Sequence, residues 1–204
     1  DTPYSQGLAE PSADTPTFLI GFPRSGTTLL DTILRTHSNI EVIEEQSMVS
    51  KAHHHLGNQL SIVDIENLTA EELTKARVVY FKELSKHVST KNSDCVIDKF
   101  PLNILDVPFI HKLFPTAKFI LALRHPLDSI FSCWMQSFKL NTSMANMVEL
   151  DRIVDFYGLA MTVLELSEKR YSLNIHSIRY EDLVLDMKSE VSNLLGFLEL
   201  DWEN

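Results

Sequence analysis

The sequence is poor in cysteine, in long apolar runs and in positive charge, and each shortage excludes a class of protein. Only two cysteines, Cys95 and Cys133, occur among 204 residues. Two cysteines cannot provide the disulfide framework of a small secreted domain. We therefore expect both thiols to be buried as small apolar groups in a reducing compartment, and we predict a cytoplasmic protein.

The shortage of apolar runs and of positive charge limits the partners. No apolar run approaches the roughly 20 residues that span a bilayer, and the N-terminus lacks a signal-peptide pattern. Eighteen Lys and Arg stand against 28 Asp and Glu, giving a net charge of −10. This balance argues against a general nucleic-acid binder, which needs a basic surface. It permits an anionic small ligand, because one site needs only a few local cations.

The chain divides into a polar tail and one domain. Residues 1–16 are rich in Pro, Ser, Asp and Thr, and we interpret them as a flexible tail or a linker from an upstream unit. Hydrophobic residues make up 44% of the chain, so residues 17–204 can bury the core of a single domain. The sequence stops at Asn204 without a recognisable ending signal, and we expect the domain to be truncated at its C-terminus.

Short apolar runs alternate with segments of helical periodicity. This alternation predicts an α/β fold, a phosphate-loop-like three-layer domain with a central parallel sheet flanked by helices. A capping box of Thr69 and Glu72 marks the start of one helix. The expected strands are 17–22, 40–43, 95–98, 118–123 and 175–180. The expected helices are 27–37, 70–88, 102–113 with a break or kink at Pro108, one starting near Pro126, 151–171, and one or two within 181–198.

Ligands of parallel sheets bind at the carboxyl ends of the strands. Residues that directly follow a predicted strand are therefore the candidates for a site. This rule selects the first loop and five residues that follow other strands: Arg24–Thr28, Glu44, Glu45, Lys99, Arg124 and Tyr180. Among them are three cations, two carboxylates and a phenol, which we expect on one rim.

The first loop, GFPRSGTTLL, lacks the lysine of a phosphate loop. Gly21, Gly26 and Thr28 fit the pattern G-x-x-x-x-G-K-[ST], but Thr27 stands where the lysine belongs. A tight turn before a helix N-terminus still aims several N–H groups at an anion, and Arg24 adds a cation. Lysine and Mg²⁺ normally neutralise a nucleoside triphosphate. The ligand should therefore carry less negative charge than ATP, and a phosphosulfate fits.

We predict no metal site. Asp98 ends a strand, but its neighbour Lys99 would repel a cation. Three adjacent histidines, 53–55, cannot chelate together from one helix, because a shared site needs i, i+4 spacing or convergence. We interpret them as part of an exposed or acceptor-facing loop. The acceptor pocket is expected from variable loops at 47–68 and 139–149.

Five motifs occur in order along the chain: PRSGTTLL, IEE, DKFPLN, LRHPLDSIFSCW and IRYEDLV. Together they resemble sulfotransferases that use 3′-phosphoadenylyl sulfate (PAPS), most nearly the protein-tyrosine sulfotransferases and the bacterial sulfotransferases often joined to tetratricopeptide repeats. The resemblance extends from about Phe18 to Trp202. It implies metal-free transfer of a sulfuryl group from PAPS to a hydroxyl acceptor, which is a peptide, a carbohydrate or a small molecule. The product is adenosine 3′,5′-bisphosphate, and a repeat domain upstream is compatible with the likeness.

The resemblance also implies roles for individual residues. The loop residues would hold the 5′-phosphosulfate, and three residues further along the chain would contact the 3′-phosphate and the rest of the donor. Glu45 matches the catalytic base, with Glu44 as its rival, and Lys99 matches the lysine that stabilises the leaving oxygen. The implied catalytic residues are Glu45, Lys99 and Arg24, and the implied donor-binding residues are Arg24, Ser25, Gly26, Thr27, Thr28, Arg124, Ser132 and Tyr180.

The chain departs from the family pattern in three places, and two alternative functions are compatible with the sequence. In the family, a segment that would follow Asn204 closes over the donor. Gln136 stands where some relatives carry an arginine near the 3′-phosphate, and Ser47 stands where the tyrosine-specific enzymes carry an arginine that engages acidic substrates. An acidic peptide is therefore a poor acceptor candidate. One alternative is a Mg²⁺-dependent small-molecule kinase or nucleotide hydrolase. The other is a non-catalytic module that binds adenosine bisphosphate.

Overall fold

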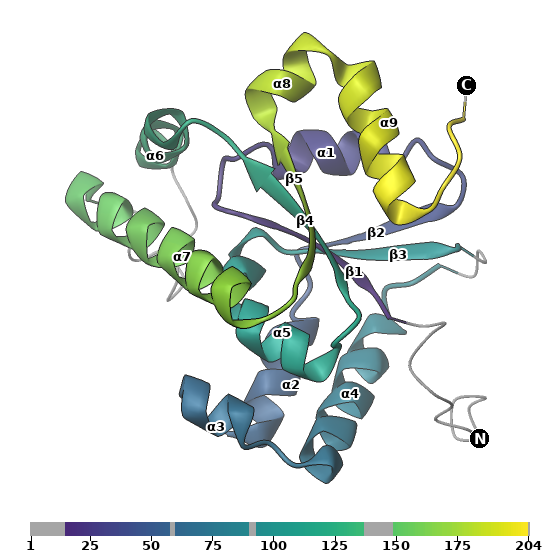
Figure 1. Cartoon of the computed structure of the whole chain (residues 1–204), viewed down its shortest axis with the longest axis vertical. Coiled ribbons are helices and arrows are strands. Elements are labelled where there is room, and N and C mark those ends of the chain that lie inside the picture. The colour runs from purple at the N-terminus through teal and green to yellow at the C-terminus, as the bar shows by residue number, and fades with distance from the viewer. Residues whose placement is uncertain (1–14, 58–59, 90–92, 137–148, 204) are drawn as a thin grey trace.

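A computed structural model of the chain describes residues 15–57, 60–89, 93–136 and 149–203. Its centre is a five-stranded sheet in the order β2-β3-β1-β4-β5, and all neighbouring strands pair in parallel (Figure 1). Each strand agrees with its predicted apolar run to within one residue at either end. The strands are β1 (Thr17–Gly21), β2 (Ile40–Glu44), β3 (Cys95–Lys99), β4 (Lys118–Leu123) and β5 (Asn174–Arg179).

Helices cover both faces of this sheet, because the central strands are apolar on both sides. Along β1, Phe18 and Ile20 enter one core cluster and Leu19 enters the other. Residues of α1, α8 and α9 pack in the Leu19 cluster, whereas α2, α4, α5, α6 and α7 contribute to the Phe18 cluster. The predicted three-layer α/β fold is thereby confirmed. The helices are α1 (Thr27–Leu34), α2 (Met48–Leu56), α3 (Ile62–Glu66), α4 (Ala70–Leu84), the 3₁₀ helix η2 (Pro101–Asp106), α5 (Val107–Leu113), α6 (Pro126–Trp134), α7 (Leu150–Arg170), α8 (Tyr180–Leu185) and α9 (Met187–Leu198).

The helix boundaries refine the predictions. The capping box is present, with the Glu72 N–H donating to Thr69 Oγ1 at 3.3 Å and the Thr69 N–H donating to Glu72 Oε2 at 2.8 Å. The predicted helix over 102–113 is split before Pro108, into η2 and α5. Pro108 lies in the first turn of α5, where its missing N–H costs no hydrogen bond.

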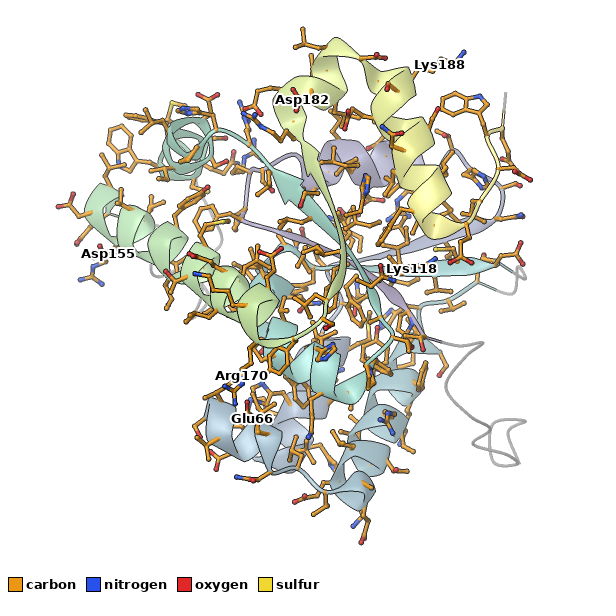
Figure 2. The ribbon with its side chains drawn as sticks, viewed as in Figure 1. Glu66, Lys118, Asp155, Arg170, Asp182 and Lys188 are labelled. Carbon is orange, nitrogen blue, oxygen red and sulfur yellow. The ribbon has the colours of Figure 1, made fainter. Side chains whose placement is uncertain are left out.

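The segment 47–68 was expected to be a loop, and this prediction was wrong. It contains α2 and α3, on either side of the undescribed residues 58–59. Met48, Val49 and Ala52 are buried along α2 at helical spacing. Three polar histidines follow in its last turn, so the apolar periodicity that would indicate a helix is short. An ion pair between Glu66 of α3 and Arg170 of α7 ties this region to the rest of the domain (Figure 2). Residues 1–14 of the predicted tail and 139–148 of the second acceptor loop lie outside the described residues.

Candidate active site

Two glycines allow the loop between β1 and α1 to pass close to its neighbours. Gly26 has a φ of 102°, and a Cβ at this position would lie 2.9 Å from the Tyr180 ring. At Gly21 a Cβ would lie 2.6 Å from the carbonyl oxygen of Ala122 on β4. A side chain at either position would clash, so the loop needs glycine at both.

The same loop leaves the N-terminus of α1 open to an anion. Gly26 is its N-cap and provides no side-chain cap, and the first turn contains no acidic residue. Ser25 is buried, and its hydroxyl has no hydrogen-bond partner. Free N–H groups at a helix N-terminus and an unpaired buried hydroxyl favour a negatively charged ligand.

Arg24, Ser132, Arg124 and Tyr180 form a group that we call the Arg124 cluster. Arg24 has a φ of 69°, and its Nε donates to Ser132 Oγ at 2.9 Å. Arg124 donates from Nη1 to the backbone oxygen of Arg24 at 3.4 Å, and its guanidinium carbon lies 4.7 Å from the centre of the Tyr180 ring. Arg24 thus contacts both Arg124 and Ser132, two of the donor-binding residues that the family resemblance implies.

Arg124 retains capacity for an anion. Its Nε is buried without a hydrogen bond, and a carboxylate oxygen of Asp128 lies 4.0 Å away. Glu181 is a residue that the sequence did not single out. It accepts a hydrogen bond of 2.8 Å from the His125 N–H, and this bond lowers the pKa of Glu181, with Arg179 and Arg124 adding a smaller effect. Glu181 therefore secures the turn that presents Arg124.

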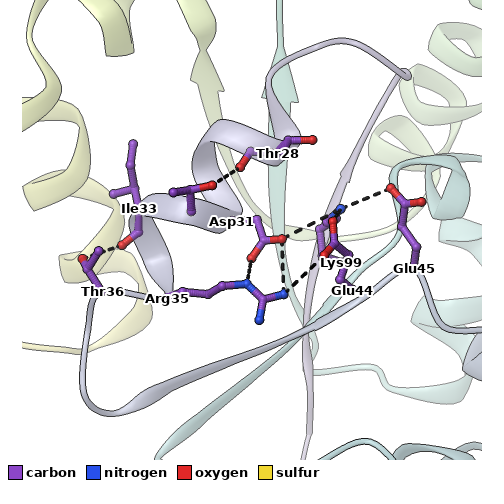
Figure 3. A network of polar contacts seen from close by, with 9 residues as sticks. Thr28, Asp31, Ile33, Arg35, Thr36, Glu44, Glu45 and Lys99 are labelled. Carbon is purple, nitrogen blue, oxygen red and sulfur yellow. Dashed lines mark hydrogen bonds and ion pairs between the residues drawn. The ribbon is translucent and has the colours of Figure 1, made fainter.

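The second group of side chains lies at the ends of β2 and β3. Lys99 is completely buried, and its Nζ donates to Glu44 Oε1 at 2.8 Å and to Glu45 Oε1 at 3.2 Å (Figure 3). The strand register places Glu44 opposite Lys99. Glu45 has a φ of 48°, and its N–H donates to the Lys99 carbonyl oxygen at 2.7 Å. This turn, which is uncommon for a residue other than glycine, brings both carboxylates to one lysine.

Two further residues of this group were missed by the sequence analysis. Asp31 is buried on α1, with its Oδ2 3.9 Å from Lys99 Nζ. Arg35 pairs with Asp31 and places Nη2 at 3.8 Å from Glu44 Oε2. The hydrogen bond from Lys99 is the main cause that lowers the pKa of Glu44, and Arg35 contributes. The i, i+4 spacing of Asp31 and Arg35 was the available signal. We call Lys99, Glu44, Glu45, Asp31 and Arg35 the Lys99 cluster.

Asp98, the neighbour of Lys99, points to the opposite face of the sheet. It is fully buried, and the Tyr80 hydroxyl donates to its Oδ2 at 2.9 Å. Burial raises the pKa of Asp98 to about 7, and the hydrogen bond from Tyr80 offsets part of that shift. No group of three His, Cys, Asp or Glu side chains that would suit a metal ion occurs in the described part of the chain.

The three adjacent histidines and the two cysteines lie outside both clusters. His53 stacks on Phe109 with 4.7 Å between ring centres, whereas the next two histidines are exposed. Cys95 and Cys133 are buried free thiols, as expected, and burial raises the pKa of Cys133 to about 11.

The profile of the sulfotransferase family matches residues 16–204. The chain belongs to the sulfotransferase family. It is 29% identical to protein-tyrosine sulfotransferase 1 of Danio rerio, with 92% of this chain and 54% of that protein covered. It is 26% identical to nodulation protein NoeE of Sinorhizobium fredii, covering 90% and 50%, and 28% identical to an uncharacterized protein of Aquifex aeolicus, covering 98% and 27%. The chain thus spans about half or less of the length of these curated relatives.

Solved structures show the same fold. The sulfotransferase domain from the curacin biosynthetic pathway superposes with a TM-score of 0.60 at 21% identity, covering 94% of this chain and 76% of that one. Sulfotransferase STF1 from Mycobacterium tuberculosis gives a TM-score of 0.64 at 12% identity, covering 95% and 70%. Within the residues that the structure describes, no helix has the length and apolar character needed to cross a membrane.

Proposed function

We propose that this member of the sulfotransferase family transfers a sulfuryl group from PAPS to a hydroxyl acceptor. The observation that carries the proposal is the placement of two unlike clusters at the strand ends. The Arg124 cluster and the open N-terminus of α1 supply unpaired donors, while the Lys99 cluster supplies a lysine together with a carboxylate. The first set suits a multiply charged anion, and the second suits a proton transfer coupled to a departing oxygen.

The residues present fit the donor. Ser25 Oγ and Arg124 Nε are both buried without partners, and each gains a hydrogen bond from an anionic oxygen. We assign the loop residues 24–28 to the phosphosulfate. Arg124 and Ser132 are assigned to the 3′-phosphate, and Tyr180, stacked under Arg124, keeps that guanidinium in place.

The proposed reaction is a direct exchange of one S–O bond for another. The acceptor oxygen forms a bond to sulfur as the bond between sulfur and the bridging phosphate oxygen breaks. The electron pair of the broken bond remains on adenosine 3′,5′-bisphosphate. Glu45 takes the acceptor proton, and Lys99 stabilises the charge on the leaving oxygen. A lysine ammonium has three N–H donors, and two of them are directed to Glu44 and Glu45, so one is available for that oxygen.

Glu45 is a better base than Glu44 for an electrostatic reason. Glu44 lies between Lys99 and Arg35, which lower its pKa and favour the ionised state as a permanent partner. Glu45 contacts only Lys99 in this cluster, and 57% of its side chain is exposed. It can therefore reach a hydroxyl group that arrives from solvent.

Ligand-dependent melting separates this proposal from the two alternatives. Adenosine 3′,5′-bisphosphate at about one hundred times its Kd should stabilise the fold by about 2.7 kcal/mol. This corresponds to a rise in Tm of roughly 5–10 °C for a chain of this size. Stabilisation by Mg·ATP alone would support the kinase or hydrolase. Stabilisation by the bisphosphate, without transfer from radiolabelled PAPS to any alcohol in a broad acceptor panel, would support the non-catalytic module.

A further inference from the structure

A cleft of about 180 Å³ lies between the start of α2 and the 3₁₀ helix η2. Gln46 and Ser47, which line one side, directly follow Glu45 in the chain. Phe100, on the other side, directly follows Lys99. We call this depression the α2–η2 cleft. Its lining thus includes the chain neighbours of the two residues to which the transfer chemistry is assigned, and from this we infer that a hydroxyl compound held there would approach Glu45.

The cleft combines an apolar body with a few polar groups. Phe100 and Leu105 give it an apolar surface, while Ser47 and Asn103 contribute polar groups. Asn103 is only 5% exposed, and its Nδ2 donor has no partner. Buried donors are normally paired, so a ligand oxygen would satisfy it. The volume is roughly six times the 30 Å³ that a water molecule occupies in the liquid, which suits one ring-sized group.

The charges around the cleft are negative. Asp106 is the charged residue among those that line it, and no lysine or arginine does so in the described parts of the chain. The nearest partner of Asp106 is His53, whose Nδ1 lies 3.4 Å from Asp106 Oδ1 and is charged only when protonated. On the inner side, Lys99 is already shared by Glu44 and Glu45. An acidic ligand would therefore meet like charge without a compensating cation.

We propose that the α2–η2 cleft binds the acceptor, and that the acceptor is a small, partly apolar hydroxyl compound without an acidic group, with a cationic substituent favoured over a neutral one. This inference rests on the proposed sulfuryl transfer, because it takes the cleft to be the approach to Glu45. The charge preference itself can be measured by binding alone.

Three probes with one hydroxyphenyl body isolate the effect of charge: tyramine, para-ethylphenol and para-hydroxyphenylpropionate. Their dissociation constants would be measured by NMR titration of the protein saturated with adenosine 3′,5′-bisphosphate. Tyramine should bind at least about tenfold more tightly than the propionate, with the neutral phenol between them. Asp106→Asn should reduce this ratio at least about threefold, and Ser47→Lys should reverse the order.

Asp94→Asn is the matched control, because it removes the same charge from an exposed residue just before the other end of β3. It should leave the ratio unchanged. Circular dichroism and the Tm of each variant establish that the fold is retained. The inference is overturned if the propionate binds as tightly as tyramine, if none of the probes binds, or if Asp106→Asn and Asp94→Asn have equal effects. If the probes bind in the expected order but no sulfate is transferred, the proposed function fails and the charge preference of the cleft stands.

Discussion

The Lys99 cluster lies at the ends of β2 and β3, whereas the Arg124 cluster lies at the ends of β4 and β5, and the loop after β1 runs between them. In the Lys99 cluster two cations meet three carboxylates, and Lys99 is fully buried among them. In the Arg124 cluster two arginines are held by a hydroxyl, a backbone oxygen and an aromatic ring. In the described part of the chain, Asp128 pairs with Arg124 at 4.0 Å, and Glu181 also interacts with Arg124 electrostatically.

This difference indicates separate tasks. A cluster whose cations are already compensated gains little from another anion, but it can hold a carboxylate and an ammonium ready for proton and charge transfer. A cluster whose guanidinium groups are less fully compensated gains more when an anion arrives. We therefore expect substitutions in the first cluster to change the rate of transfer, and substitutions in the second to change donor affinity.

The sharpest test of this division is Glu45→Gln. Removal of the proposed base should lower the transfer rate by about 10²–10⁴-fold, while the affinity for adenosine 3′,5′-bisphosphate stays within about twofold. Radiolabelled sulfate transfer and calorimetric titration measure the two quantities. Glu44→Gln serves as the comparison and should cost less than about tenfold in rate. If Glu44→Gln had the larger effect, the base would be Glu44.

Arg124→Ala should show the opposite behaviour. Loss of the proposed charge-assisted hydrogen bond to the donor should weaken bisphosphate binding about 10- to 100-fold, with a much smaller effect on the rate at saturating PAPS. Arg152→Ala is a suitable control, because Arg152 makes an exposed pair with Glu149 on α7. Unchanged bisphosphate affinity in Arg124→Ala would show that Arg124 does not bind the donor, and the proposed division of tasks between the two clusters would then be wrong.

The sequence predicts the fold and the strand-end residues for one physical reason. Strands buried on both faces are nearly continuous apolar runs, so their ends are visible, and parallel strands bring their carboxyl ends to one edge. Lys99, Glu44 and Glu45 follow directly from that rule. Their contacts do not, because the pairing of Glu44 with Lys99 depends on strand register and on the positive φ of Glu45.

The parts that could not be predicted depend on packing across the chain. Asp31 lies in the middle of an apolar helix, where its i, i+4 spacing to Arg35 indicates a local ion pair but not the approach of Lys99 to 3.9 Å. The helix α2 is concealed by its polar end, although its buried residues follow helical spacing. The position of Ser132 next to Arg24 joins segments 108 residues apart, which no local pattern reports.

Asp31→Asn tests whether the Lys99 cluster acts as a unit. The substitution keeps the shape of the side chain but removes the only carboxylate of the cluster that is buried, so Lys99 should be held less firmly. We expect a roughly fivefold lower rate at saturating substrates, equivalent to about 1 kcal/mol, with bisphosphate affinity unchanged. Asp31→Glu should recover part of the rate. A loss of bisphosphate affinity equal to the loss of rate would show instead that α1 and its anion-binding turn had moved.

The smallest expected effect is on stability and concerns Glu44. The pKa of Glu44 is lowered in the folded protein, so its contribution to stability is present above the unfolded pKa and is lost as the pH falls through the folded one. Because the side chain is 52% exposed, Glu44→Gln should cost less than about 1 kcal/mol near neutral pH. Urea unfolding at a series of pH values should show this difference shrinking as the pH falls below the ordinary glutamate pKa of about 4.3. Glu71→Gln, from an exposed pair with Lys75 on α4, provides the matched control. If the stability difference between the wild type and Glu44→Gln persisted at the most acidic pH, it would not arise from the charge of Glu44. The compensation of Lys99 would then be assigned to Asp31 and Glu45.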